Sequence, residues 1–155
     1  EILIEKTTEA GLKGIDKIID EIISKNFNAI KENFEIMKMF KEMFNSIETS
    51  PSFQLKKHYP EIYQKLILQS ENECNLMFKQ NIQKGIEQGL YRKDINVNHY
   101  AIFYQVLINY INENICSEKE SKIYELNALE YHIRALATQK GIVELEKNLK
   151  THILH

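Results

Sequence analysis

Two cysteines and five histidines are the first side chains of this protein to consider as nucleophiles or metal ligands. Cys74 and Cys116 stand far apart among apolar neighbours, a setting that favours buried, inert thiols over a reactive nucleophile. His152 and His155 fall on one helical face near the end of the chain, and two imidazoles alone make a weak metal site. The chain also lacks G-x-S-x-G, H-E-x-x-H and glycine-rich phosphate-binding motifs. We therefore predict a protein without enzymatic activity, metal or cofactor.

A group of large apolar side chains is better suited to binding a small molecule. Aromatic rings and methionines are bulky and partly deformable, as the walls of an apolar ligand pocket need to be. Asn81 falls on the apolar side of its helix, where a buried amide either has structural partners or contacts a polar ligand atom. The same side chains would also make an ordinary core, so pocket and core both stay open. The pocket candidates are Phe34, Met37, Phe40, Phe44, Tyr63, Leu66, Met77, Phe78, Asn81 and Phe103.

Helices are the elements that must position these side chains. Glycine and proline are rare, no stretch alternates with period two, and no Asn-Gly or Asp-Gly hairpin signal occurs. Apolar residues instead recur at roughly 100° per residue. We predict an all-α bundle of about six to seven helices, at about 1–24, 27–47, 51–58, 60–89, 97–115, 122–137 and 139–150.

Length and composition suit one soluble globular domain spanning residues 1–155, with 43% hydrophobic and 27% charged residues. With a net charge of −2, the chain lacks the excess of basic residues that is expected of a free-standing nucleic-acid binder. No apolar run reaches the ~18 residues that a membrane-spanning helix needs. Two cysteines exclude a disulfide framework, so we expect a reducing, cytoplasmic location.

The predicted helix 122–137 has two separate apolar faces. One face holds Leu126, Leu129, Ile133, Leu136 and Ala137, and the other holds Tyr124, Ala128, Tyr131 and Ala135. Two faces predict a helix between its own core and a second surface, most simply the seam of a homodimer. The alternative is a central helix of one bundle, and the sequence does not decide which face is the seam. The dimer-interface candidates are Tyr104, Ile108, Ile111, Leu126, Leu129, His132, Ile133 and Leu136.

Three segments carry a family resemblance. The long helix opens with Tyr59-Pro60-Glu61-Ile62-Tyr63 and ends in Gly85-Ile86-Glu87-Gln88-Gly89-Leu90-Tyr91-Arg92-Lys93-Asp94-Ile95. A later segment reads Arg134-Ala135-Leu136-Ala137-Thr138-Gln139-Lys140-Gly141. The last two resemble the G-I-x-x-G-x-[FY]-R-x-D-[IV] and R-G-[IL]-x-T-x-x-G motifs in the regulatory domain of TetR-family transcription regulators. Ala135 departs from the glycine that is common there. For Arg92 and Asp94 we expect a structural role, pairing or capping helix ends.

The resemblance implies a TetR-like C-terminal regulatory domain that dimerises through the two helices before the last one. It implies a bacterial regulator, most simply a repressor that a small apolar or amphipathic effector releases from operator DNA. DNA binding would reside in an N-terminal helix-turn-helix domain that this stretch does not contain, with Glu1 just past that domain. The alternative is an all-helical protein-interaction or scaffold module without a small-molecule ligand.

Overall fold

The computed structural model describes residues 16–43, 51–115 and 117–153, and confirms the all-α prediction. Helical residues 16–24 precede α2 (Ala29–Met43), and the remaining helices follow in chain order. In the described part of the chain, no helix is both long and apolar enough to cross a membrane. The later helices are α3 (Pro51–His58), α4 (Pro60–Glu87), α5 (Val97–Asn114), α6 (Glu118–Leu136) and α7 (Gln139–Ile153).

Local sequence signals explain where these helices begin and end. Pro60 takes the first helical position of α4, where its missing N–H costs no hydrogen bond. The Asn96 side chain caps α5 by accepting from the His99 amide, and Gly89 ends the α4 turn with a φ of 69°. The predicted start of α6 at 122 is one turn too late, because Ser117 caps the helix by accepting from the Glu120 amide.

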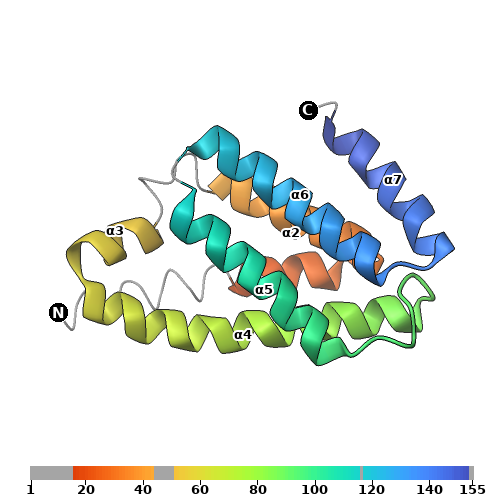
Figure 1. Ribbon diagram of the computed structural model, residues 1–155, viewed down its shortest axis with the longest axis horizontal. Coiled ribbons are helices and arrows are strands. Elements are labelled where there is room, and N and C mark those ends of the chain that lie inside the picture. Colours follow the sequence, from red (N-terminus) through yellow and green to blue (C-terminus); the bar gives the residue numbers. More distant parts are fainter. Residues whose placement is uncertain (1–15, 44–50, 116, 154–155) are drawn as a thin grey trace.

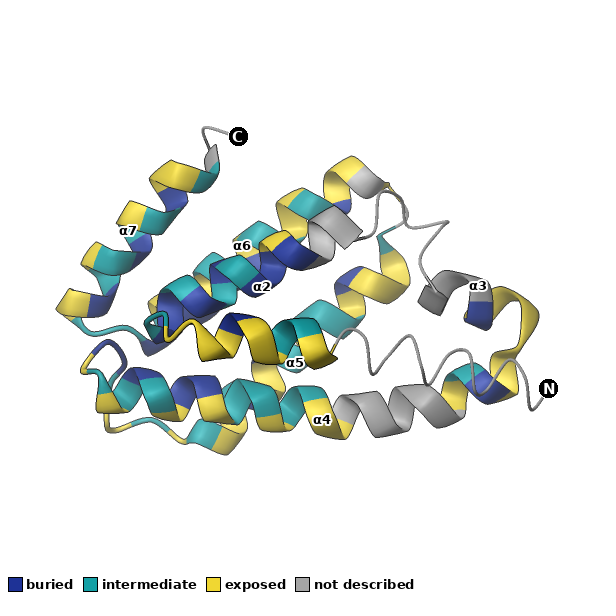
Figure 2. Cartoon of the chain, turned by 180° about the vertical axis from the view of Figure 1, so that it is seen from behind, coloured by how far each residue is buried: buried dark blue, intermediate teal, exposed yellow. Residues whose placement is uncertain are grey.

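The helices pack around one large apolar core. α5 lies beside α6, with α2 behind α6 and α4 along the lower edge (Figure 1). The buried residues of α7 line the side that faces α2 and α6 (Figure 2). The largest fully buried side chains of this core are Tyr91, Phe34, Ile30, Ile82, Leu129, Ile133, Leu136 and Leu145. A smaller, separate cluster joins residues 16–24 to α2 through Ile22, Ile36 and Met39.

The two motif segments near 85–95 and 134–141 form one structural unit, which we call the motif junction. Backbone amides of Arg92 and Thr138 donate to the carbonyls of Leu136 and Leu90, at 2.8 and 2.9 Å. The Arg92 guanidinium also donates to the Ala135 carbonyl at 2.9 Å. The junction therefore fixes the end of α4 against the turn between α6 and α7.

Glycine is required at two places in the motif junction because other groups approach closely. A Cβ on Gly85 would lie 2.1 Å from the Tyr91 ring, and a Cβ on Gly141 would lie 2.1 Å from the Leu90 carbonyl oxygen. Arg92 also pairs with Asp94 at 3.5 Å, which agrees with the structural role predicted for both. Gly85, Gly141 and the Arg92–Asp94 pair thus have structural roles within this chain.

Candidate functional site

The interior is the first candidate site, and three predicted pocket residues meet there. Phe34 and Met37 are buried in the main core, and Phe78 packs against it. Their neighbours are rings: Phe34 lies edge-on to His152 at 4.8 Å, and Phe78 lies 4.9 Å from Tyr104, both between ring centroids. These side chains act as packing in the described structure, the alternative that the sequence had left open.

Two open grooves of the described structure lie away from these side chains. An open groove of roughly 530 Å³ is lined by Asn28, Gln88, Leu90, Lys140, Val143 and Glu144. A second, of roughly 320 Å³, is lined by residues 58–62, at the turn between α3 and α4. Neither groove is lined by a predicted pocket residue.

The other described pocket candidates lie in different parts of the structure. Met77 packs against the small Ile22 cluster, and Tyr63 is half-buried near the Lys56 ammonium. Phe103 lies 58% exposed on the outer side of α5, so its predicted place in the interior is wrong. Its position faces away from the core because α5 turns its Ala101 and Tyr104 side inward. Phe44 and the side chains of Phe40 and Leu66 lie outside the described structure.

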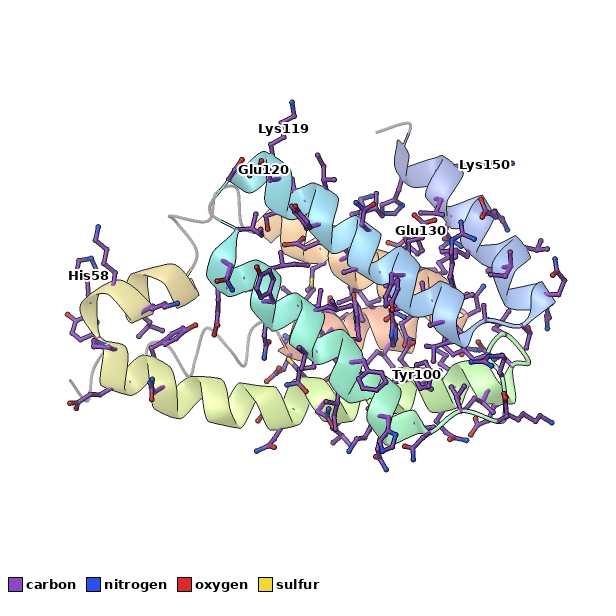
Figure 3. All side chains as sticks on the ribbon, in the orientation of Figure 1. His58, Tyr100, Lys119, Glu120, Glu130 and Lys150 are labelled. Carbon is purple, nitrogen blue, oxygen red and sulfur yellow. The ribbon has the colours of Figure 1, made fainter. Side chains whose placement is uncertain are left out.

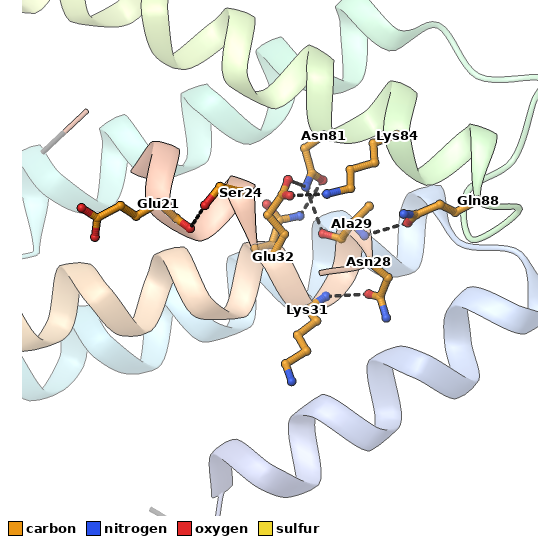
Figure 4. Close-up of polar contacts among 10 residues, drawn as sticks. Glu21, Ser24, Asn28, Ala29, Lys31, Glu32, Asn81, Lys84 and Gln88 are labelled. Carbon is orange, nitrogen blue, oxygen red and sulfur yellow. Dashed lines mark hydrogen bonds and ion pairs between the residues drawn. The ribbon is translucent and has the colours of Figure 1, made fainter. Parts of the chain in front are cut away.

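Asn81 belongs to a polar cluster buried between α2 and α4 (Figure 4). Its amide group donates to the Ala29 carbonyl and to the Glu32 carboxylate, both at 2.9 Å. Its oxygen accepts from the Asn33 amide at 2.8 Å, and Lys84 forms an ion pair with Glu32. Asn81 is therefore satisfied by structural partners, which decides the choice that the sequence left open. The sequence reasoning missed Glu32 and Lys84, whose pairing joins residues far apart in the chain.

Tyr91 sits next to this cluster with its side chain fully buried. Its hydroxyl makes no hydrogen bond of good geometry, although the Asn33 side chain lies beside it. Burial raises the pKa of Tyr91 well above its ordinary value. The hydroxyl therefore stays protonated, and it is the polar atom of this core that a ligand or water could satisfy at a gain in free energy.

His132 lies in the core, although its position in the sequence suggested a polar border. Its ring stacks on Tyr104 with centroids 4.3 Å apart, in the interface between α5 and α6. Burial lowers the pKa of His132 to about 3, because a charged imidazolium would lose its hydration there. The imidazole is neutral at physiological pH.

The predicted dimer-interface residues lie on the inner side of α5 and α6. Ile108 and Leu126 are half-buried against the core. This leucine-rich face packs within one chain in the described structure. The fully or nearly buried members of the set are Tyr104, Ile111, Leu129, His132, Ile133 and Leu136.

The opposite side of the same two helices is apolar and exposed. It carries aromatic and branched side chains that are between 51% and 69% exposed. We call this surface the aromatic face. Large exposed apolar side chains gathered on two neighbouring helices are typical of interaction sites in soluble proteins. Tyr124 and Tyr131 were recognised in the sequence as a second face of α6, whereas the matching stripe on α5 was missed. The aromatic face comprises Phe103, Val106 and Tyr110 of α5 and Tyr124 and Tyr131 of α6, flanked by Ile102 and Ile123.

No group of three or more histidine, cysteine or carboxylate side chains could hold a metal ion in the described residues. No family model, curated protein or solved structure matches this chain. The geometry of the aromatic face and of the interior is therefore the basis for the proposals that follow.

Proposed function

We propose that this chain is the effector-binding and homodimerisation domain of a TetR-like bacterial transcriptional regulator. The observation that carries the proposal is the aromatic face, because a helical domain gains little from leaving such surface in water. A second copy covering it would hold two upstream DNA-binding heads at a fixed separation, as two operator half-sites require. The motif junction supports the resemblance, because two motif segments more than forty residues apart in the chain bind each other through backbone hydrogen bonds.

The effector in this proposal binds between α2 and α4. Phe34, Met37 and Phe78 supply apolar contacts, and the Tyr91 hydroxyl supplies a polar group without a good partner. Entry requires these side chains to repack, so the effector would favour a different arrangement of the helices around it. A ligand shifts such an equilibrium only by its difference in affinity for the two states. The helix of residues 16–24, held by its own small cluster, is the element that would pass the change upstream.

The test uses the full-length native protein, including whatever precedes Glu1. Fluorescence anisotropy with DNA from the region upstream of its own gene measures binding, with the isolated 155-residue chain as the matched control. We expect the full-length protein to bind and the isolated chain not to bind. Absence of DNA binding by the full-length protein, or a native protein without a DNA-binding domain, contradicts the proposal.

A scaffold module with a filled core is the second candidate, and the packed interior favours it. The two candidates differ in their response to amphipathic probes such as 8-anilino-1-naphthalenesulfonate. The regulator predicts a saturable part of the probe fluorescence that the substitution Met37→Trp removes, because the larger ring fills the repacked space. A scaffold module predicts a probe signal that Met37→Trp leaves unchanged, because the probe then binds only to exposed apolar surface such as the aromatic face.

A further inference from the structure

The larger open groove, beside the motif junction, combines apolar surface with charged side chains. Three parts of the chain line it: the residue before α2, the turn after α4 and the beginning of α7. Leu90, which is buried, and Val143, which is 64% exposed, supply the apolar surface. Its volume of roughly 530 Å³ lies within the range of small-molecule sites, ~300–1,000 Å³. The groove can therefore hold a small ligand, and its charged groups indicate which kind.

The two charged side chains of the groove are held apart. Lys140 and Glu144 stand four positions apart on α7, where side chains of opposite charge can pair. Among the described contacts, however, no ion pair joins them. The Lys140 ammonium donates to the Gln88 carbonyl, and the Glu144 carboxylate accepts from the Asn28 amide, both at 3.0 Å. The groove thus presents a positive and a negative group that do not neutralise each other.

Both charged groups keep hydrogen-bonding capacity for a ligand. The Lys140 ammonium has three donors, of which the described residues use one. The Gln88 side-chain oxygen accepts from the Ala29 amide, whereas its NH2 group has no partner among the described residues. The hydrogen bonds to the Glu144 carboxylate within the described structure go to Oε1, which leaves Oε2 available. The groove therefore offers donors for an anionic group and an acceptor for a cationic group.

We propose that this groove binds a free α-amino acid with an aliphatic side chain. The ligand carboxylate accepts from Lys140 and from the Gln88 NH2 group, and the ligand ammonium donates to Glu144 Oε2. Positions four apart on a helix have Cβ atoms about 5–6 Å apart, which suits a ligand whose two charges are joined through one carbon atom. Leu90 and Val143 contact the aliphatic side chain of the ligand.

This site is separate from the effector region proposed between α2 and α4 and does not depend on that proposal. Its residues also hold the first turn of α2 (Figure 4). The Asn28 side chain accepts from the Lys31 amide, at 2.9 Å. The Gln88 side chain accepts from the Ala29 amide, also at 2.9 Å. A ligand that binds only the folded chain stabilises it, so binding should also raise the melting temperature.

The experiment titrates L-leucine into the full-length protein by isothermal titration calorimetry, with thermal melts as a second measurement. Two matched compounds each lack one charge: 4-methylpentanoate has no ammonium, and 3-methylbutylamine has no carboxylate. We expect leucine to bind saturably with a dissociation constant of about 1 mM or below. Each single-charge compound should bind about tenfold more weakly, because it loses the hydrogen bonds of one charged group.

Substitutions in the groove should separate the two charges of the ligand. Lys140→Met should weaken the binding of leucine and 4-methylpentanoate about five- to tenfold and leave 3-methylbutylamine unaffected. Glu144→Gln should weaken the binding of leucine and 3-methylbutylamine instead. The controls Lys150→Met and Glu120→Gln remove the same charges at exposed positions elsewhere, in the last turn of α7 and the first turn of α6 (Figure 3). Both controls should bind leucine as the original protein does.

The outcomes decide the site and the class of ligand. The absence of saturable leucine binding at millimolar concentrations overturns the proposal. Binding that both groove variants leave unchanged also overturns it, because the ligand then occupies another site. Leucine binding no tighter than that of either single-charge compound overturns the amino-acid class. Circular dichroism of each variant checks the fold, and none of these results bears on the proposed regulator, whose own test is DNA binding.

Discussion

Leu129 and Tyr131 lie two positions apart on α6 and face opposite ways, so one substitution at each separates folding from association. Leu129 is 1% exposed and belongs to the main core, whereas Tyr131 is 69% exposed on the aromatic face. We predict that Leu129→Asp unfolds the chain. We predict that Tyr131→Asp leaves the fold intact and abolishes dimerisation.

The magnitudes follow from burial. Removing a fully buried leucine from the core costs about 2–3 kcal/mol of apolar burial. Placing a carboxyl group there without a partner adds several kcal/mol more, whether it stays charged or takes up a proton. The sum, about 5 kcal/mol or more, is comparable to the whole stability of a typical domain, ~5–15 kcal/mol. Tyr131 buries little surface in the monomer, so its replacement removes little apolar burial. Substitutions at solvent-exposed positions usually change the free energy of unfolding by less than about 0.5 kcal/mol.

Chemical denaturation followed by circular dichroism measures the first effect, and sedimentation velocity measures the second. Leu129→Ala, expected to cost about 2–5 kcal/mol, keeps the comparison measurable if the aspartate variant does not fold. Gln64→Glu, at an exposed position on α4 away from the aromatic face, is the control for added charge. The reasoning is refuted if Leu129→Asp stays folded and monomeric, because the leucine-rich face would then be the dimer seam after all.

Three further predictions concern the motif junction and the core. Gly85→Ala should destabilise the chain by about 1–3 kcal/mol, measured by urea denaturation, because the added Cβ overlaps the Tyr91 ring and forces the junction apart; an unchanged midpoint would show that the ring can move aside freely. Tyr91→Phe should leave stability unchanged or raise it by up to about 1 kcal/mol, since it removes a buried hydroxyl without a good partner; a loss above about 1 kcal/mol would show that the hydroxyl is hydrogen-bonded. The buried His132 should make stability depend on pH, because its pKa is near 6.5 when unfolded and about 3 when folded. The unfolded chain then binds more protons below pH 6.5, so this stability is present above that pH and falls as the pH drops toward 3. The loss is roughly 2 kcal/mol by pH 5. His132→Phe should flatten this part of the pH profile in thermal melts, and an equally steep profile in the variant would assign the effect to other groups.

Local signals allowed most of the helical framework to be predicted. The apolar period predicted helices at 60–89 and 97–115, and in the structure Pro60, Gly89 and Asn96 lie at the ends of α4 and α5. These signals work because capping and backbone constraints involve residues within a few positions of one another. Ser117 offered the same signal for α6, but the polar residues after it were interpreted as a connection.

The site depended on contacts that no local pattern contains. Asn81 could have bound a ligand or had structural partners, and the decision came from Glu32 and Asn33, which α2 brings from almost fifty residues away. Likewise, Phe103 has the chemistry of a pocket residue and lies outside because α5 packs through its opposite side.

The sequence by itself determined that this chain is helical and that α6 carries two apolar faces. The apolar residues of the exposed stripe on α5 also stand in the sequence, although that stripe was recognised only on α6. Only the tertiary structure decided which stripe is core and which is surface. Apolar stripes on a helix are chemically alike, and the one that is buried is the one against which α2, α4 and α7 can close-pack.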